Sequence, residues 1–281
     1  MVTNFYNNKD KFNYIRYNSL PAFADYVIDH PKQYYDGWGV QIAHDKPIGI
    51  DFDNIKSGDT IFVTTEFLPQ ILPLLNKIDT PYHLITGVGD GTPEKNIIDE
   101  ILKTKILTWS GNNIPKIDKR FLQIPIGLSE LGDKRPNSFT DYVDLPTHKI
   151  IHIVSTPVGG THSSRKELQN LLGYNILNIT ERISFQDYMY VLCLSKFSCC
   201  PRGNGIDTHR VTESILFNSI PIVKTSILDP MYQEMRAVIV TDWGACKNLD
   251  SIPVPKLNRD VVTLEYWRAR LLDHQHSFNE R

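Results

Sequence analysis

The chain has 281 residues, 41% of them hydrophobic, and its 30 Lys and Arg against 32 Asp and Glu give a net charge of −2. This apolar content excludes a disordered chain, and the slight acidic excess argues against a nucleic-acid partner, which would need cations to neutralise its phosphates. No apolar run approaches the length of about 20 residues that a transmembrane helix needs. Residues 1–6 lack the apolar segment of a signal peptide. We therefore expect a cytoplasmic protein with no membrane partner.

Alternating strands and helices are predicted in the first half of the chain. Apolar β-branched runs predict strands, and runs that are apolar on one face predict helices. The predicted strands are 60–64, 82–86, 105–109 and 121–126, and the predicted helices are 66–77 and 94–103. Pro69 and Pro73 should bend or restart the first helix. A polar, turn-rich stretch without periodicity, 127–146, predicts a linker.

The second half has the clearer pattern. The predicted strands are 149–155, 175–179, 197–200, 220–224 and 238–241, and the predicted helices are one that Ser163 opens, 185–194, 208–217 and 260–275. Strands that alternate with helices at these spacings indicate parallel βαβ units. We therefore expect an α/β fold of two Rossmann-like lobes with a cleft between them. The lobes are 1–145 and 146–258, and a C-terminal helix within 259–281 crosses back to the first lobe.

One segment, Phe197–Val223, carries the densest cluster of polar residues. A predicted strand breaks into a glycine-rich loop, and Asp207 with Thr208 forms a helix N-cap signature. A helix N-terminus that follows glycines such as Gly203 is a ready anion site. Arginine side chains nearby suit a diphosphate, because guanidinium groups match phosphate oxygens.

The helix that follows this loop adds three candidate ligand-binding residues. His209, Arg210 and Glu213 can share one helix face, and Arg202 lies in the loop before them. Glu213, one turn deeper than Arg210, could accept hydrogen bonds from two hydroxyls of a sugar such as ribose. The alternative is a capping network with an Arg–Glu pair at the surface.

A second predicted helix start could also carry phosphate charge. Ser163 and Ser164 offer hydroxyl and N–H donors there, and Arg165 follows them, although it could equally be an ordinary exposed helix residue. A metal ion is the usual alternative to arginines. Asp51-Phe52-Asp53 fits the Asp-x-Asp pattern formally, but we favour a surface loop for it and expect no metal and no other cofactor.

The chain resembles the exostosin-like glycosyltransferases at four places that together span about residues 60–245. The elements of the first are Pro201, Gly203, His209-Arg210, Glu213 and Ile220-Pro221-Ile222-Val223. The others are Trp109-Ser110-Gly111-Asn112 with Lys119 and Ile124-Pro125-Ile126-Gly127, then Ser164-Arg165 with Leu168, and last Val240-Thr241-Asp242-Trp243. Asn218 departs from the pattern, because the family usually has a small residue there.

This resemblance implies a GT-B fold and an inverting glycosyltransferase whose UDP-sugar donor is bound mainly by the second lobe. The donor-binding residues would be Ser163, Ser164, Arg165, Arg202, Gly203, Asp207, His209, Arg210 and Glu213. The short chain, with no predicted membrane anchor, resembles the exostosin-like enzymes of large algal viruses more than the membrane-anchored Golgi enzymes. That similarity implies UDP-xylose as the donor and the synthesis of a capsid glycan in the cytoplasm of a host cell.

Transfer to a glycan acceptor also needs a base that takes the proton of the acceptor hydroxyl. In this architecture the acceptor lies on the first lobe, where Asp90 and Glu66 follow predicted strands and His44 is a third candidate. In the alternative interpretation, Asp90 orders its glycine turn and Glu66 caps a helix.

Aromatic side chains of the first lobe could stack on the apolar faces of sugars. Tyr34, Tyr35 and Trp38 cluster near the N-terminus, and we place Tyr35, Trp38, His44 and Trp109 in the acceptor site. Core packing is the alternative for such rings.

The four cysteines, Cys193, Cys199, Cys200 and Cys246, lack C-x₂-C spacing and are expected to be free core thiols. A nucleotide-sugar or glycan-binding protein without turnover, and a nucleotide-sugar hydrolase or epimerase, remain rival functions. The sequence indicates no oligomeric state.

Overall fold

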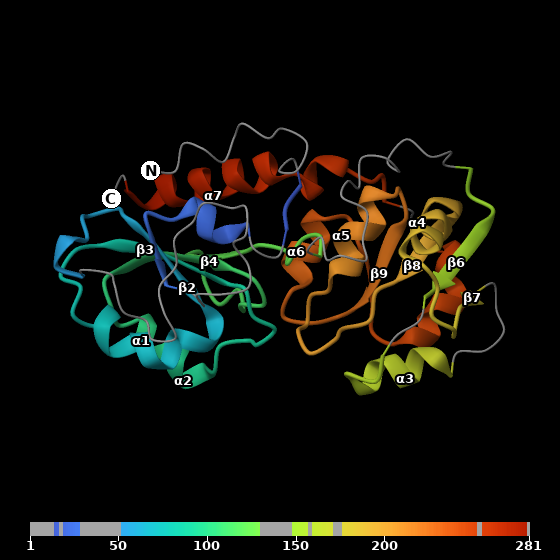
Figure 1. Cartoon of the computed structure of the whole chain (residues 1–281), viewed down its shortest axis with the longest axis horizontal. Coiled ribbons are helices and arrows are strands. Elements are labelled where there is room, and N and C mark those ends of the chain that lie inside the picture. Colours follow the sequence, from blue (N-terminus) through green and yellow to red (C-terminus); the bar gives the residue numbers. More distant parts are fainter. Residues whose placement is uncertain are drawn as a thin grey trace. The chain divides into compact units, whose positions relative to one another are not determined.

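The computed structural model describes residues 14–16, 19–28, 52–129, 148–156, 159–170, 176–251 and 255–279 (Figure 1). The chain divides into two compact units, which are residues 1–126 with 264–281 (unit 1) and residues 127–263 (unit 2). The corresponding boundaries predicted from the sequence lie at residues 145 and 258. Each unit contains a five-stranded parallel sheet with helices, which confirms the predicted α/β class.

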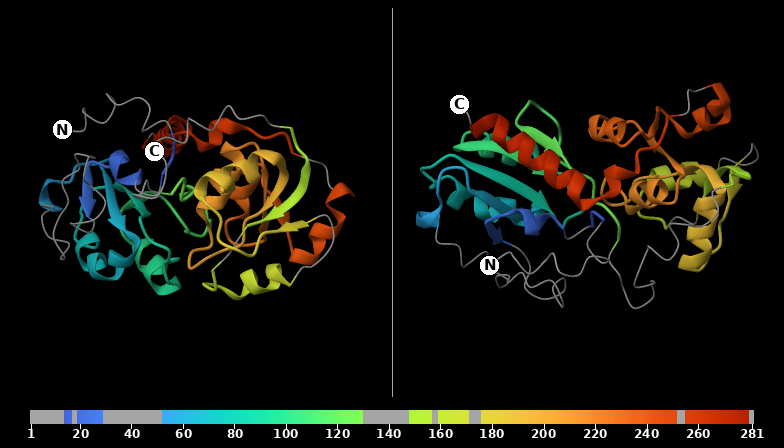
Figure 2. Two further views of the ribbon diagram at one scale, coloured as in Figure 1. Left: turned by 45° about the vertical axis from the view of Figure 1, so that its right-hand side comes forward. Right: turned by 90° about the horizontal axis from the view of Figure 1, so that it is seen from above.

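Unit 1 has the strand order β1-β2-β3-β4-β5. Its strands are β1 (Tyr26–Ile28), β2 (Thr60–Thr64), β3 (Tyr82–Gly87), β4 (Ile106–Gly111) and β5 (Phe121–Gln123). Helices α1 (Leu68–Leu75) and α2 (Lys95–Ile101) lie on one face of the sheet, and α7 (Leu264–Asn279) lies on the other (Figure 2). The predicted strands and helices of this unit are present, although β5 ends at Gln123 and not at residue 126, and β1 had no predicted counterpart.

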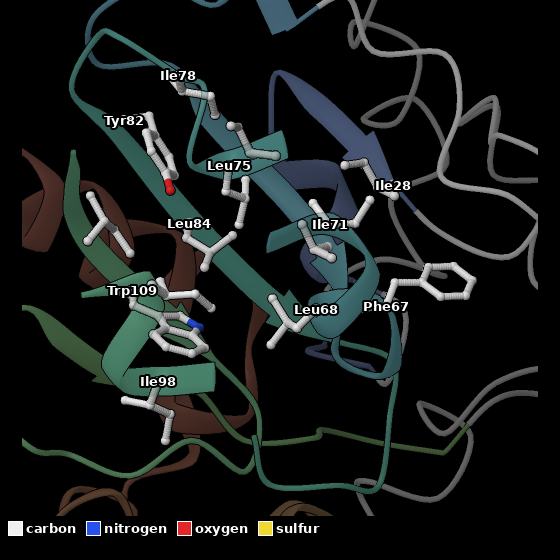
Figure 3. Close-up of a cluster of buried hydrophobic side chains, with 14 of the residues drawn as sticks. Ile28, Phe67, Leu68, Ile71, Leu75, Ile78, Tyr82, Leu84, Ile98 and Trp109 are labelled. Carbon is white, nitrogen blue, oxygen red and sulfur yellow. The ribbon is translucent and has the colours of Figure 1, made fainter. Parts of the chain in front are cut away.

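The core of unit 1 fills the space between the sheet and helices α1 and α2 (Figure 3). All five residues of β2 are buried, as expected for a parallel strand that is covered on both faces. Ile71 and Leu75 of α1 pack with Leu84 of β3, and all three side chains have no exposed surface. Pro73 lies inside α1, which ends two residues later.

Helix α7 is tied to the opposite face by polar contacts. Gln275 Nε2 donates to Thr60 Oγ1 at 3.0 Å, and Asn279 Oδ1 lies 3.1 Å from His83 Nε2. Burial lowers the pKa of His83, which is almost completely buried. The last helix of the chain is therefore part of unit 1, although about 140 residues of unit 2 separate it from β5 in the sequence.

Unit 2 has the strand order β10-β9-β8-β6-β7. Its strands are β6 (Ile151–Ser155), β7 (Ile176–Asn178), β8 (Ser195–Cys199), β9 (Ile220–Lys224) and β10 (Val238–Val240). Its helices are α3 (Ser163–Gln169), α4 (Phe185–Leu194), α5 (His209–Leu216) and α6 (Asp229–Glu234), and a 3₁₀ segment covers Trp243–Ser251. Numbered within the unit, the strand order is 2-1-3-4-5. The chain adds β7 on one side of β6 and then β8, β9 and β10 on the other side, so the order of the strands reverses between β6 and β8.

Helices cover both faces of the unit 2 sheet (Figure 1). Leu168 of α3 and Trp243 of the 3₁₀ segment share a core cluster with β8, β9 and β10, whereas α4 and α5 lie on the other face. Helix α5 is anchored to β8 by Ser214, whose Oγ accepts from Ser198 Oγ at 2.6 Å. The turn that follows its last residue, Leu216, contains Asn218, whose φ of 59° is left-handed. Asparagine tolerates this conformation better than most residues, which accounts for the departure from a small residue there.

All four cysteines are buried and free, as the sequence predicted. Lys149 caps the ends of two helices, since its Nζ donates to the carbonyl of Cys193 at 2.7 Å and lies 3.5 Å from that of Phe217. Within the described ranges, no helix has both the length and the apolar character that a bilayer crossing requires.

Candidate functional site

The candidate site is a cavity of about 560 Å³ in unit 2, lined by the residue after β6 and by the segments that follow β6, β7 and β8. Ligands of open parallel sheets bind where the strand order reverses, and β6 and β8 flank that point. The volume lies within the range of small-molecule sites. The cavity is lined by Thr156, Arg165, Arg182, Ile183, Ser184, Phe185, Tyr188, Thr208, His209, Arg210 and Glu213.

Two arginines from different helices converge on the cavity. Arg210, in the first turn of α5, donates from Nη1 to the carbonyl of Thr156 at 3.3 Å and to the Thr156 hydroxyl, at the end of β6. Arg165, on α3, donates from Nε to the carbonyl of Arg202 at 2.8 Å. Burial, and then the charge of Arg210, lowers the pKa of Arg165. Two neighbouring cations in one partly buried cavity favour an anionic ligand, which relieves their repulsion.

Gly203 allows Arg165 to take this position. A Cβ atom at Gly203 would lie 2.8 Å from Nη2 of Arg165, closer than side-chain carbon atoms normally approach. The glycine-rich loop after β8 therefore serves the site by leaving room for the guanidinium group, and Arg202 of the same loop holds that group through its backbone carbonyl.

A buried carboxylate forms another part of the wall. Glu213 is 4% exposed, and its Oε2 accepts from the Tyr188 hydroxyl at 2.9 Å while its Oε1 accepts from Ser129 Oγ at 3.2 Å. Burial, and then the charge of Glu213, raises the pKa of Tyr188 well above its usual value. Each carboxylate oxygen has two acceptor positions, so Glu213 retains capacity to accept from a ligand hydroxyl.

His209 lines the same cavity and is held from behind. Its Nδ1 lies 2.8 Å from the carbonyl oxygen of Gly127, so Nδ1 carries the proton and donates it. In a neutral imidazole Nε2 then has the lone pair. Thr208 precedes α5 with an extended backbone and completes the wall at the helix start.

Four of the nine predicted donor-binding residues line this cavity, namely Arg165, His209, Arg210 and Glu213. Ser164 and Arg202 line a second, smaller cavity. Ser163 is exposed at the start of α3, and Gly203 acts through Arg165. Asp207 is 2% exposed, and its Oδ1 accepts from the N–H of Thr208 at 2.9 Å and from the Tyr232 hydroxyl at 3.3 Å, as a structural cap would.

The face of the cavity that α4 contributes was not predicted from the sequence. Phe185 and Tyr188 have ring centroids 6.0 Å apart, and the guanidinium carbon of Arg210 lies 6.0 Å from the Tyr188 ring centroid. Ser184, which caps α4, and Arg182 come from the loop before it. The spacing of α4 predicted a helix, but nothing in it showed that its first turn faces a site. Aromatic faces beside a cation can stack against a planar nucleobase.

In unit 1, Glu66 and Asp90 follow the neighbouring parallel strands β2 and β3, and both are exposed. The carboxylate of Glu66 packs directly against Gly89, because a Cβ atom there would lie 2.3 Å from both of its oxygens. Val88, which precedes Gly89, has a φ of 55°. A left-handed β-branched residue is a strained outlier, and such strain is found often at functional sites.

Trp109 is a core residue in this structure. It is fully buried, its Nε1 donates to Thr86 Oγ1 at 2.9 Å, and its ring centroid lies 5.5 Å from that of Phe121. A ring with no exposed surface cannot stack on a sugar, so we do not retain Trp109 in the acceptor site. The other predicted acceptor residues, Tyr35, Trp38 and His44, lie outside the described residues.

Among the described residues, no group of three or more His, Cys, Asp or Glu side chains could hold a metal ion. Asp53 is exposed in the 3₁₀ turn Phe52–Asn54, and Asp51 is outside the described residues. Neither a scan against protein-family models nor a search of curated proteins finds a match for this sequence.

Proposed function

We propose that the protein is an inverting, metal-independent glycosyltransferase of the GT-B type that takes its sugar from a UDP-sugar donor. The observation that carries this proposal is the cavity at the β6–β8 switch point, where Arg165 and Arg210 converge beside the buried carboxylate of Glu213. The resemblance of the loop and helix around Arg210 to exostosin-like glycosyltransferases supports the same function.

The cavity contains side chains that could bind each of the three parts of a nucleoside diphosphate, which are the diphosphate, the ribose and the nucleobase. Arg165 and Arg210 would bind the diphosphate and stabilise the charge that it gains on leaving. Glu213 would accept hydrogen bonds from the ribose hydroxyls, with its orientation fixed by Tyr188 and Ser129. The aromatic rings of Phe185 and Tyr188 would stack on the uracil base of the nucleotide.

The transfer itself would be a single displacement. The acceptor oxygen forms a bond to the anomeric carbon while the bond from that carbon to the diphosphate oxygen breaks, which inverts the anomeric centre. The proton of the acceptor hydroxyl passes to a carboxylate of unit 1, and UDP leaves with the bonding electron pair. Asp90 and Glu66 are the candidates for this base, and xylose is our proposed sugar.

A panel of UDP, GDP, UDP-xylose, UDP-glucose and GDP-fucose tests the class of donor by thermal shift. A ligand at 100 times its Kd stabilises the folded state by about 2.7 kcal/mol, which is several degrees in Tm. We expect stabilisation by the uridine nucleotides and not by the guanine nucleotides. A panel in which no nucleotide raises the Tm would contradict the proposal.

The base is tested with Asp90→Asn and Glu66→Gln, measured as sugar transfer beside UDP affinity. The true base should lose at least about 100-fold in turnover while its affinity for UDP is unchanged. Gly89→Ala should slow turnover less, because it only displaces the Glu66 carboxylate. Treatment with EDTA should leave transfer unchanged. Normal turnover in both carboxylate variants would remove these residues from the mechanism.

A further inference from the structure

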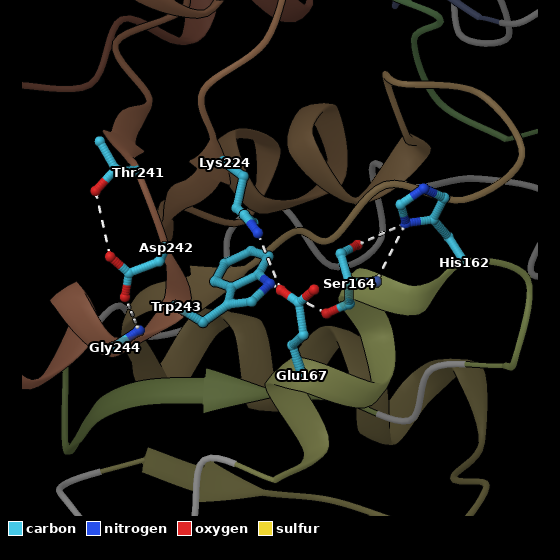
Figure 4. A network of polar contacts seen from close by, with 8 residues as sticks. All are labelled: His162, Ser164, Glu167, Lys224, Thr241, Asp242, Trp243 and Gly244. Atoms are coloured by element: carbon cyan, nitrogen blue, oxygen red, sulfur yellow. Dashed lines mark hydrogen bonds and ion pairs between the residues drawn. The ribbon is translucent and has the colours of Figure 1, made fainter.

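A second cavity, of about 150 Å³, lies in unit 2 at the carboxyl ends of β8 and β9. Its wall includes His162, Arg202 and Lys224, which come from three separate segments, and one carboxylate, Glu167. Figure 4 shows Lys224 beside Glu167, and His162 on the far side of Ser164. The proposed donor site uses none of these side chains, so the second cavity requires its own explanation.

Among the side chains that line this cavity, the charge balance is positive. Lys224 Nζ and Glu167 Oε2 form an ion pair at 2.9 Å, so the single carboxylate is already balanced by one cation (Figure 4). The guanidinium charge of Arg202 remains in addition. Burial, and then the charge of Arg202, lowers the pKa of His162 on the other wall.

Arg202 also has a buried donor that nothing in the described residues satisfies. Its Nε atom is shielded from solvent and has no hydrogen-bond partner, while its Nη2 donates to the carbonyl of Asn204 at 3.2 Å. A buried cationic donor without a partner is costly, so a ligand oxygen within reach of Arg202 Nε would be stabilising. An anion in the adjoining cavity would satisfy this donor.

We propose that this second cavity binds a tetrahedral oxyanion, which is either a free phosphate or sulfate ion or the phosphate group of a larger ligand. Its volume corresponds to about five water molecules, close to the five heavy atoms of such an ion. The Arg202 guanidinium would hold two oxygens, and the Lys224 ammonium would act as a point charge on a third. This inference does not depend on the proposed transferase activity.

The test is a calorimetric titration of the full-length chain with inorganic phosphate, with sulfate and with glycerol 3-phosphate, in a chloride buffer. We expect saturable binding of inorganic phosphate that Arg202→Met and Lys224→Met each weaken by at least about tenfold. Lys166→Ala is the matched control, since it removes one exposed cation from α3 outside the cavity. It should bind phosphate as the wild type does.

The same titration in saturating UDP separates the two cavities. Phosphate in the second cavity should still bind when UDP is present and should still bind to Arg210→Ala. If phosphate binding is lost in Arg210→Ala but kept in Arg202→Met, the ion binds in the donor cavity and the proposal is overturned. The absence of saturable binding up to millimolar phosphate would overturn it as well. If Arg202→Met does not fold, Arg202→Lys takes its place, because an ammonium group cannot form the bidentate contact and should also bind more weakly.

The substituted ligand identifies the source of the group. Tighter binding of glycerol 3-phosphate than of inorganic phosphate would identify a phosphate monoester as the occupant. Equal or weaker binding would identify the free ion. Both results support an oxyanion site, and both require the loss of affinity in Arg202→Met.

Discussion

Tyr188→Phe is the sharpest test of how the buried carboxylate is held. The substitution removes the hydroxyl that donates to Glu213 Oε2 at 2.9 Å and leaves the ring in place. A hydrogen bond to a charged group contributes about 1.5–3 kcal/mol. Since Tyr188 lines the 560 Å³ cavity, a water molecule can replace part of this contact. We therefore expect Tyr188→Phe to lower the free energy of unfolding by about 1–2 kcal/mol.

A double-mutant cycle with Glu213→Gln isolates the contact between these two side chains. A neutral hydrogen bond contributes about half as much as a charge-assisted one, so the coupling energy should be about 1 kcal/mol. The assay is urea denaturation of the wild type, both single variants and the double variant. Tyr190→Phe is the control, because Tyr190 lies on the same helix and is 41% exposed. Its effect should stay below about 0.5 kcal/mol.

The result that contradicts this expectation is a loss of unfolding free energy in Tyr188→Phe no larger than that in Tyr190→Phe, or a cycle without coupling. Either result would mean that the Tyr188 hydroxyl does not bind a charged Glu213 in solution. The affinity for UDP provides an independent measure, because a misoriented Glu213 should weaken UDP binding less than the loss of Arg210 does.

Three further predictions concern the two units. Burial raises the pKa of Tyr82 from 10.0 to about 12, so the folded state keeps this proton longer than the unfolded chain does. Unfolding free energy should therefore fall between pH 10 and 12, by at most about 2.7 kcal/mol, and Tyr82→Phe should reduce that fall in pH-dependent denaturation. Burial lowers the pKa of His83 below 6.5, so the free energy of unfolding should fall as the pH falls through 6.5. This fall should be smaller in His83→Gln. An equal fall in His83→Gln would mean that another group causes it. Lys149→Met removes the cap on α4 and α5 and should lower Tm by a few degrees, whereas a Tm unchanged from that of the wild type would show that the cap contributes nothing.

Strands and helices with strong local patterns could be predicted from the sequence. Helix α4 and strand β9 have the bounds that their apolar spacing predicts, since long runs of one period bury one face or both. The three-residue edge strand β1 and the six-residue helix α6 were missed. Elements this short form because neighbouring strands and helices hold them, and their own residues carry little signal.

Individual residues of the candidate site were harder to predict than its location. The loop and helix around Arg210 stood out because glycines, arginines and a carboxylate at helical spacing are unusual between two apolar strands. Tyr188 could not be recognised, because its contact with Glu213 joins residues 25 positions apart and arises only from the packing of α4 against α5. Trp109 was wrongly placed in the acceptor site. An aromatic residue at the end of a predicted strand gives the same sequence pattern whether it packs in the core or contacts a ligand.

A calorimetric titration of UDP into the wild type, Arg210→Ala and the control Arg259→Ala tests the proposed donor site most directly. Arg259 is exposed in unit 2 and lines neither cavity. We expect one UDP site per chain, an affinity for UDP at least about tenfold weaker in Arg210→Ala, and wild-type affinity in Arg259→Ala. UDP that fails to bind the wild type, or that binds Arg210→Ala as tightly as the wild type, would contradict the proposed donor site.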